Sequence, residues 1–446
     1  MSDNGIDRGP GGCVICGLQF GDEGKGQIVD YLAGDFDVVV RYNGGANAGH
    51  SVWIGDRRKA FHLMPSGILR DGVLNVIGNG TALDPAQLLK EMDELQAEGY
   101  PVDPDRLAIS DRAHVVMPYH KIEDELMDRA FASGENGENG EIGTTRRGIG
   151  PCYADKAHRV TAVRMADIKD QPYLGARLPR LVSLKNSLLG ALATESGRDF
   201  RELASEPIME QCAEWGSRLA PYITDTEYVL DDARRSGRNI LFEGAHAALL
   251  DVDFGTYPYC TSSVCSPGGA LAGTGLAART LGEVVGVAKL YMSRVGEGPF
   301  PTEIPGEAAD RIREAGSEYG TSTGRPRRVG WLDLVALRHT ARVTGVTALA
   351  VTGLGVLSTL SELRVCSGYS IGTERVDRVP ANVRRLGDVQ PHYEELEPVG
   401  GPLDGIRRRA DLPSGARRLI ERVESFVNVP VRYICVTKGR AGVIAE

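Results

Sequence analysis

The sequence predicts an α/β fold with a mainly parallel central sheet covered by helices. Apolar runs near residues 37–41, 73–77 and 106–109 read as strands, and a helical pattern over Pro85–Ala97 has Leu88, Leu89, Met92 and Leu95 on one face. Alternating strands and helices are typical of a parallel sheet. A glycine-rich loop between a first strand and a first helix adds a P-loop-like phosphate-binding element, and helical or loop insertions complete the predicted fold.

The composition is that of an ordinary globular protein. Apolar residues make up 42% and charged residues 25% of the 446 residues. The net charge of −9 argues against general binding to nucleic acid or to anionic membranes, because both need a basic face. Anionic ligands must therefore be met by local arginine clusters.

The chain is expected to form one domain over residues 12–446 after a disordered lead-in, 1–11, although its length would allow two or three domains. No apolar run approaches a membrane span, and the polar N-terminus has no signal-peptide core. Eight cysteines without a repeated spacing suit reduced thiols, and Cys13 and Cys16 would point to opposite faces of a strand. We expect a cytoplasmic protein.

The first glycine-rich loop, Gly17–Gly26, follows the apolar run 13–16 and precedes a helical pattern, 27–33. Such a loop presents unpaired backbone N–H groups and the positive end of a helix to an anion. It resembles the P-loop motif, but Gln19 replaces the first glycine and Gly26 replaces the residue that would hold magnesium. Lys25 keeps the phosphate role, and Asp22 is the nearest carboxylate for a metal ion.

The second glycine-rich loop, Asn43–His50, follows the apolar run Val38–Val40. A lone histidine is more often an ordinary, partly buried side chain than a catalytic one. Placed in NGGANAGH directly after a strand, His50 becomes a candidate catalytic acid.

The two loops together carry a family resemblance. GLQFGDEGKGQIVDYLA and VVRYNGGANAGHSV resemble the signature of the adenylosuccinate synthetases, and the similarity continues almost to the C-terminus. In that family the aspartate of GDEGKG and the histidine of NAGH are the acid/base pair, which implies Asp22 and His50 here, with Lys25 beside them. The resemblance also implies Mg²⁺ on Asp22 and on the carbonyl of Gly49.

The resemblance implies three substrates, namely IMP, L-aspartate and GTP, and a site for each. The triphosphate site would use Gly21, Glu23, Gly24, Lys25, Gly26, Gly49, His50, Ser51 and Arg327. The IMP site would use Asp22, Lys25, Asn47, Ala48, Gly49, His50, Thr145, Arg159, His246, Thr261 and Arg325. The aspartate site would use Thr321, Ser322, Thr323, Gly324, Arg325 and Arg327.

The segment GENGENGE, residues 134–141, is too polar and glycine-rich to pack, so it predicts a mobile loop. The following IGTTRRGIGP resembles a family segment that closes over a substrate phosphate. By that resemblance Thr145 and Arg159 meet the nucleotide monophosphate, and Arg159 reaches in from the partner subunit of a homodimer. Arg146 replaces the usual glycine of this segment. Residues 171–237 predict supporting helices.

Three regions depart from the family pattern. His246 stands where the family has a glutamine that touches the substrate base, and a histidine lacks the paired donor and acceptor of an amide. Gly353 and Gly355 follow the predicted strand 348–352 at the places of the family's guanine-reading lysine and aspartate. The last predicted strand, 436–442, departs as well.

A second charged cluster lies in the turn Arg325–Arg328. Three arginines in a short glycine-bearing turn of an acidic protein favour an anion site, and guanidinium groups suit the two carboxylates of aspartate.

These observations and the family resemblance favour one reaction type. The resemblance implies that the 6-oxygen of a purine nucleotide is phosphorylated and then displaced by the amine of aspartate. In the family this converts IMP, L-aspartate and GTP into adenylosuccinate, GDP and phosphate, on the route to AMP. One alternative is the same chemistry on another 6-oxopurine nucleotide, such as a nucleoside-antibiotic precursor, with GTP or ATP.

Two further alternatives come from other functional classes. A regulatory GTPase-like switch would need an NKxD guanine reader and a Ser or Thr on magnesium, and the sequence has neither. An inactive scaffold is disfavoured by the intact Asp22, Lys25, His50 and arginine turn.

Overall fold

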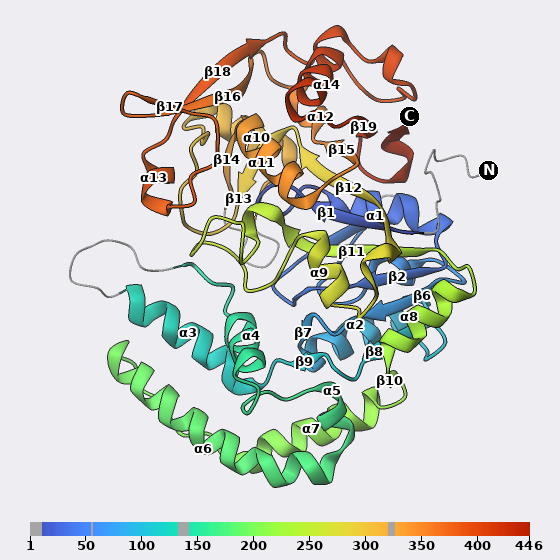
Figure 1. The fold of residues 1–446 in the computed structure, drawn as a ribbon, viewed down its shortest axis with the longest axis vertical. Helices are drawn as coiled ribbons and strands as arrows, with labels where there is room; N and C mark the ends of the chain where they lie inside the picture. Colours follow the sequence, from blue (N-terminus) through green and yellow to red (C-terminus); the bar gives the residue numbers. More distant parts are fainter. Residues whose placement is uncertain (1–10, 55–56, 133–141, 320–325) are drawn as a thin grey trace.

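A computed structural model describes residues 11–54, 57–132, 142–319 and 326–446. Within these residues the main sheet has ten strands in the order β10-β8-β6-β2-β11-β1-β12-β15-β19-β20 (Figure 1). Only the β19–β20 pair is antiparallel. The predicted α/β fold is confirmed. The strands are β1 Gly12–Gly17, β2 Val38–Arg41, β6 Leu74–Ile77, β8 Leu107–Ser110, β10 Ile223–Thr224, β11 Ile240–Ala247, β12 Leu281–Lys289, β15 Ala348–Thr352, β19 Val431–Cys435 and β20 Val443–Ala445.

Strand β1 lies at the centre of this sheet, between β11 and β12, and all of its residues are buried. Cys13 packs with Ile28 and Val29 of α1, whereas Cys16 packs in the core on the opposite face. All eight cysteines are free thiols. The prediction that Cys13 and Cys16 point to opposite faces is therefore confirmed.

The helices cover both faces of the main sheet and extend it at one end (Figure 1). The predicted helix over Pro85–Ala97 has these same bounds, and its four named apolar residues are buried. The helices are α1 Lys25–Leu32, α2 Pro85–Ala97, α3 Pro118–Ala132, α4 Ile149–His158, α5 Met165–Lys169, α6 Gln171–Glu195, α7 Ser205–Leu219, α8 Thr226–Arg235, α9 Pro267–Ala272, α10 Glu307–Gly316, α11 Leu334–Thr344, α12 Leu354–Leu357, α13 Val383–Gly387 and α14 Ser414–Val427.

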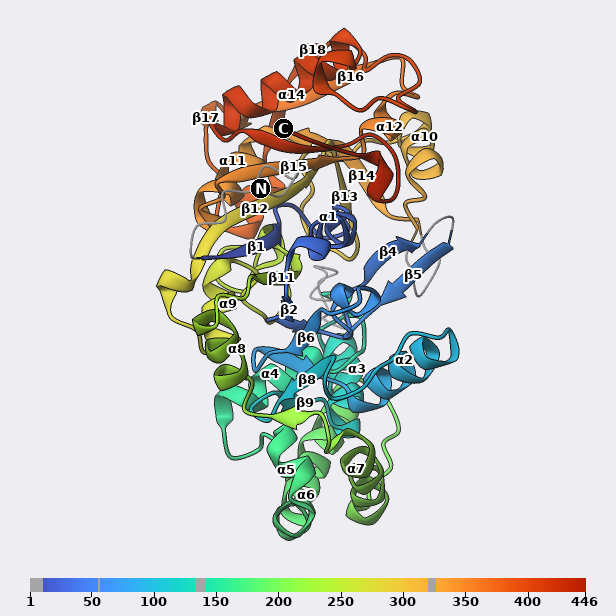
Figure 2. The same cartoon turned by 90° about the vertical axis from the view of Figure 1, so that its right-hand side faces the viewer.

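A second sheet lies at the end of the molecule opposite α3 and α6 (Figure 1). The sequence did not predict it. Its strands are β13 Tyr291–Arg294, β14 Arg328–Asp333, β16 Leu363–Ile371, β17 Glu374–Val376 and β18 Gln390–Leu396. Two small sheets complete the strands: the hairpin β4–β5, His50–Ile54 and Arg57–Phe61, which projects beside the main sheet in Figure 2, and β3–β7–β9, Gly44–Gly45, Thr81–Leu83 and His114–Val115.

Several local expectations need correction. Residues 436–442 follow strand β19 and lead into β20, so they connect two strands rather than form one. Strand β11 extends beyond the predicted apolar run and includes His246. Helices α6, α7 and α8 confirm that 171–237 is mostly helical, although Leu188, one of the apolar residues that predicted a packed face, is 38% exposed. The predicted mobile loop, 134–141, and the lead-in up to residue 10 lie outside the described residues.

Among the described residues, no helix combines the length and the apolar character that a lipid bilayer requires of a spanning segment.

Candidate functional site

The first glycine loop has the backbone of an anion-binding loop. Gly21, Asp22 and Gly24 take positive φ angles of 88°, 56° and 88°, which turn the chain sharply between β1 and α1. Gly24 caps α1 without a side-chain hydrogen bond, so the first N–H groups of the helix stay available to a ligand. Lys25 opens the helix, and α1 contacts β4, the strand that His50 begins.

The Glu23 carboxylate is fully buried inside this loop. It accepts hydrogen bonds from the backbone N–H of Gln19 at 3.1 Å and of Gly21 at 2.8 Å, and it pairs with Lys25 Nζ at 2.6 Å. The Glu23 side chain thus stabilises the conformation of the loop through these contacts. The backbone carbonyl of Glu23 is also engaged, because it accepts a hydrogen bond from the Thr352 hydroxyl at 2.6 Å.

Asp22 is the exposed carboxylate of the loop, with 34% of its side chain accessible. Its Oδ2 lies 2.9 Å from Nη2 of Arg327, whose Nη1 pairs with Glu318 at 2.8 Å. Glu318 is buried and also bonds Lys289 at 2.5 Å and Tyr291 at 2.7 Å. Burial alone would raise the pKa of Glu318, but the charges of Lys289 and Arg327 lower it to about 2.

His50 forms a buried pair with Glu243 of β11. The His50 Nδ1 and a Glu243 oxygen are hydrogen-bonded, and Glu243 also accepts from the Ser66 N–H at 2.8 Å and its hydroxyl at 2.6 Å. Burial would raise the pKa of Glu243, yet His50 and Ser66 hold it below its usual value. The carboxylate therefore stays ionised and orients the imidazole.

The other ring nitrogen of His50, Nε2, is buried and has no hydrogen-bond partner in the part of the chain that the structure describes. Burial lowers the pKa of His50, and the charge of Glu243 opposes that effect. A buried nitrogen without a partner costs free energy, so an acceptor or donor supplied by a ligand would satisfy it. The Nε2 atom of His50 is thus available to hydrogen-bond with a bound ligand.

His246 lies near His50 and Lys25, and its backbone has a φ of 59°. Burial, followed by the charges of Arg41 and Lys25, lowers the pKa of His246 to about 3, so the ring is neutral at ordinary pH. The Nδ1 atom is buried and has no hydrogen-bond partner among the described residues. A neutral imidazole carries its donor and its acceptor on different nitrogens, so His246 can offer a neighbouring base one hydrogen bond but not the pair that an amide offers.

A second corner of the site is built by three separate segments. The Asn47 amide lies 3.4 Å from the Thr261 hydroxyl. Helix α4 begins nearby, because a side-chain carbon at Gly150 would lie 3.5 Å from the Ser262 hydroxyl. Gly148 caps α4 in a left-handed conformation without a side-chain hydrogen bond, which leaves the helix N-terminus open to an anion.

Other predicted site residues lie at the surface or outside the described chain. Thr145 and Gly49 are exposed, and Ala48 is buried with its carbonyl 3.0 Å from His62 Nδ1. Arg159 is exposed at the C-terminal end of α4. Residues 321–325, with the predicted Thr321, Ser322, Thr323, Gly324 and Arg325, lie outside the described residues.

Two further predicted positions have a described backbone. Ser51 lies in β4, and its side chain is outside what the structure describes. Arg146, which replaces a glycine, keeps the left-handed conformation that a glycine favours, with a φ of 55°.

The two glycines that replace the guanine-reading residues are closely packed. Gly353 has a φ of 79°, and a side-chain carbon there would lie 2.8 Å from the Tyr291 ring. A side-chain carbon at Gly355 would lie 2.9 Å from the Val436 carbonyl. Neither position has room for a base-reading side chain unless its neighbours move.

Sequence reasoning missed Glu243 and Glu318 as members of the site. The only local signal for Glu243 was an acidic residue that continues an apolar strand, where an unpaired charge would be costly. Glu318 precedes the arginine turn by a few residues, and nothing in the spacing indicates that it pairs with Arg327 and Lys289.

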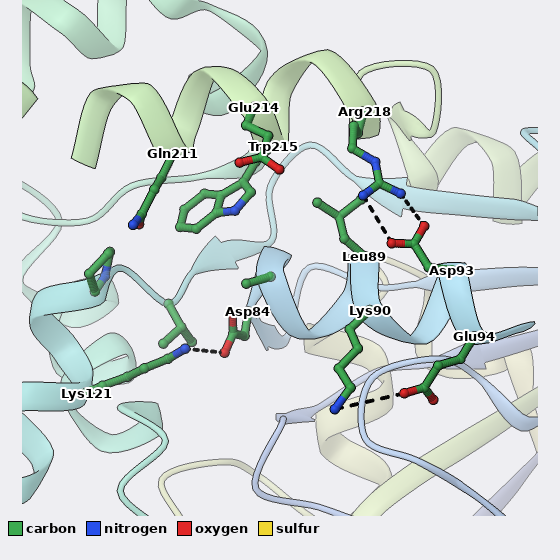
Figure 3. Close-up of a pocket in the computed structure, with 13 residues that line it drawn as sticks. Asp84, Leu89, Lys90, Asp93, Glu94, Lys121, Gln211, Glu214, Trp215 and Arg218 are labelled. Carbon is green, nitrogen blue, oxygen red and sulfur yellow. Dashed lines mark hydrogen bonds and ion pairs between the residues drawn. The ribbon is translucent and has the colours of Figure 1, made fainter. Parts of the chain in front are cut away.

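A separate cavity of about 660 Å³ lies between α2, α7 and the start of α3 (Figure 3). Six of its charged side chains form three pairs: Lys121 with Asp84, Lys90 with Glu94 and Arg218 with Asp93. None of the predicted site residues lines it. A cluster of Asp111, Asp225 and Glu227 elsewhere is already engaged by Arg112.

Comparison with known proteins gives a consistent result. The family model for adenylosuccinate synthetase matches residues 14–444. Adenylosuccinate synthetase of Caldanaerobacter subterraneus subsp. tengcongensis is 46% identical over 96% of this chain and 97% of the relative. The Streptococcus sanguinis protein of the same name is 44% identical, with 96% of each chain covered.

Two solved structures are also similar. Fully ligated adenylosuccinate synthetase from Plasmodium falciparum superposes with a TM-score of 0.90 at 33% identity, covering 98% of this chain and 99% of that one. Succinoaminodeoxyadenylate synthetase of cyanophage S-2L, bound to dGMP and dATP, has a TM-score of 0.60 at 20% identity, covering 98% and 95%. The latter similarity shows a shared fold alone.

Proposed function

The chain belongs to the adenylosuccinate synthetase family, and from that premise we propose that it joins L-aspartate to C6 of IMP at the expense of GTP. The products are adenylosuccinate, GDP and phosphate. The enzyme is a carbon–nitrogen ligase of purine biosynthesis. The observation that carries the proposal is the buried His50–Glu243 pair: among the described residues its Nε2 has no hydrogen-bond partner, and the charge of Lys25 in the phosphate-binding loop acts on the ring.

In the first step Asp22 takes the proton from N1 of IMP. The 6-oxygen then attacks the γ-phosphorus, the bond from that phosphorus to the β,γ-bridging oxygen breaks, and GDP leaves. Asp22 suits this role because its carboxylate is partly exposed, whereas the neighbouring Glu23 is buried. Lys25 and the N–H groups at the start of α1 offset the phosphate charge.

His50 donates a hydrogen bond from Nε2 to the 6-oxygen as negative charge develops there. For this the imidazole must carry a proton on each nitrogen. Burial lowers the pKa of the ring and so disfavours the second proton, and the ionised Glu243 at Nδ1 opposes that effect. The arrangement places a preorganised donor in a buried site, where it is most effective.

In the second step the amine of aspartate attacks C6. The C6–oxygen bond breaks, phosphate leaves, and the new nitrogen loses a proton to water. Arg325 and Arg327, with the backbone and hydroxyl groups of 321–324, hold the carboxylates of aspartate in this proposal. Arg327 supports it because the residue already reaches the carboxylate of Asp22.

The donor set of the site fits Mg²⁺. Asp22 offers a partly exposed carboxylate and Gly49 an exposed backbone carbonyl, and hard oxygen ligands are those that Mg²⁺ prefers. When bound, Mg²⁺ would neutralise charge on the triphosphate. Glu23, Gly24 and Gly26 contribute backbone N–H groups around the phosphates in this proposal, whereas the N–H of Gly21 is held by the Glu23 carboxylate at 2.8 Å.

The nucleotide monophosphate is proposed to lie at the corner formed by Asn47, Thr261 and the N-terminus of α4, with Thr145 beside it. Arg159 supports a homodimer. It lies exposed at the end of α4, and the following Val160 is 76% exposed, as suits a surface that a second subunit covers. The eight free cysteines favour a cytoplasmic location.

A second candidate differs in the bases rather than in the chemistry. His246 presents a neutral imidazole, and Gly353 and Gly355 present no side chain, so another 6-oxopurine nucleotide or ATP could replace IMP or GTP. One experiment separates the two: aspartate-dependent phosphate release measured for IMP, GMP and dGMP, each with GTP and with ATP. Highest kcat/KM for IMP with GTP supports the main proposal, and a higher value for another pair would overturn it.

A further inference from the structure

Segment 142–148 is anchored to helix α3 by a buried aspartate near the end of that helix. The carboxylate of Asp128 accepts hydrogen bonds from three consecutive backbone N–H groups, those of Ile142 at 3.1 Å, Gly143 at 3.2 Å and Thr144 at 3.3 Å. Three converging N–H groups form an anion-binding concavity, and here a side chain of the protein fills it.

A second aspartate, one helical turn earlier, anchors the other end of the segment. Asp124 accepts the backbone N–H of Gly148 at 2.8 Å. Burial raises the pKa of Asp124, and this hydrogen bond together with the Thr144 hydroxyl opposes the rise. Residues four apart share a helix face, so side chains on one face of α3 accept hydrogen bonds from both ends of 142–148.

No positive partner among the described residues explains the burial of the two carboxylates. Asp124 is 7% and Asp128 5% exposed. In residues 11–54, 57–132, 142–319 and 326–446, neither forms an ion pair with lysine or arginine, whereas the neighbouring Glu125 pairs with Arg129 and lies 3.9 Å from Arg146. A buried charge is costly, so the N–H groups of the segment are what compensates it.

What lies between the two anchors is the proposed phosphate-binding part of the segment. Thr145 is exposed there, and Gly148 is the residue from which α4 starts. Gly148 also fits closely, because a side-chain carbon there would lie 2.8 Å from the His120 backbone. The anchors therefore fix both the position of Thr145 and the direction in which the α4 N-terminus points.

We propose that Asp124 and Asp128 are positioning residues for the nucleotide monophosphate: they hold 142–148 in the shape in which Thr145 and the α4 N-terminus meet the phosphate. The inference rests on the proposed function for the identity of the ligand, and on the hydrogen bonds alone for the anchoring. The two parts can be tested separately.

The variants Asp124→Asn and Asp128→Asn keep side-chain size but replace one acceptor oxygen with an NH₂ group that faces N–H donors. Asp103→Asn is the matched control, since Asp103 accepts two backbone N–H groups, at 3.0 Å and 3.1 Å, in a turn outside the site. Hydrogen exchange over 142–148 reports anchoring. KM for IMP, KM for aspartate and kcat report positioning.

Both site variants should exchange faster over 142–148 and raise KM for IMP about tenfold, the factor that corresponds to ~1.4 kcal/mol. KM for aspartate and the control variant should stay near wild type. Unchanged exchange would overturn the anchoring, and faster exchange with an unchanged KM for IMP would overturn the positioning role. If the wild type neither binds nor uses IMP, the proposed substrate is wrong, and exchange still decides the anchoring.

Discussion

Nη2 of Arg327 lies 2.9 Å from Oδ2 of Asp22, so the proposed catalytic base is ion-paired before any substrate is present. The same guanidinium holds the buried Glu318 at 2.8 Å. One end of the Arg327 guanidinium is thus held by the buried Glu318, and the other end contacts Asp22. In the proposed mechanism the anionic groups of aspartate and of the triphosphate would compete with Asp22 for this cation and so release the base.

This geometry predicts the effect of Arg327→Lys. Lysine keeps the charge but cannot bridge two carboxylates with a planar fork. We expect KM for aspartate to rise at least about tenfold, equivalent to ~1.4 kcal/mol, with a smaller change in KM for IMP. Arg328→Lys is the neighbouring control, because Arg328 pairs with Glu303 at the surface. Equal effects of the two variants in steady-state kinetics would contradict the assignment.

The proposed role of Asp22 predicts a larger loss of activity for Asp22→Asn than for Arg327→Lys. Asparagine cannot take the N1 proton, so turnover should fall by about 10²–10⁴-fold, the usual contribution of a general base. Binding of the triphosphate should persist, because the loop N–H groups and Lys25 remain. Calorimetric titration with a nonhydrolysable GTP analogue measures the binding. Retained turnover would show that Asp22 is not the base.

The His50–Glu243 pair predicts a change in pH dependence. The charge of Glu243 raises the pKa of His50, so Glu243→Gln should lower that pKa further. The loss of activity that follows deprotonation of His50 should then move to lower pH, and kcat at neutral pH should fall by about 100-fold.

Ser66→Ala provides the control for this pair, because Ser66 bonds the same carboxylate at 2.6 Å without supplying its charge. Its pH profile should keep the wild-type position. If both variants lower kcat with no displacement of the profile, Glu243 acts only through packing.

The parts of the site that the sequence predicted are those built from neighbouring residues. Strand β1, the loop and α1 follow each other in the chain, so apolar pattern, glycines and lysine were enough to place them. The His50–Glu243 pair joins residues 193 apart, and no local pattern encodes that contact. The second sheet was missed for a related reason. Apolar and polar residues alternate only weakly along strand β18, and the strand is mostly exposed. Its pairing with β16 is therefore decided by tertiary structure.

Glu318 predicts acid sensitivity of the fold. Its pKa is about 2 in the folded protein against an ordinary value of 4.5. Because the folded pKa is the lower one, its stabilising contribution, of order 3 kcal/mol, is complete above pH 4.5 and is lost as the pH falls toward 2. Glu318→Gln should therefore flatten the decline of the thermal midpoint below pH 4.5. The exposed Glu374, paired with Arg385, gives the control variant Glu374→Gln, whose profile should match wild type.

Arg159 predicts complementation between two inactive proteins. If Arg159 serves the site of the partner subunit, each site takes Asp22 from one subunit and Arg159 from the other. Asp22→Asn then removes the first contribution and Arg159→Ala the second. In a mixed dimer, the subunit with Asp22 intact receives an intact Arg159 from its partner, so one of the two sites is whole. Mixing the variants under conditions of subunit exchange should restore activity to a substantial fraction of wild type, measured as aspartate-dependent phosphate release. If Arg159 acts within its own chain, each mixed site keeps one defect, and the mixture stays as inactive as its parts.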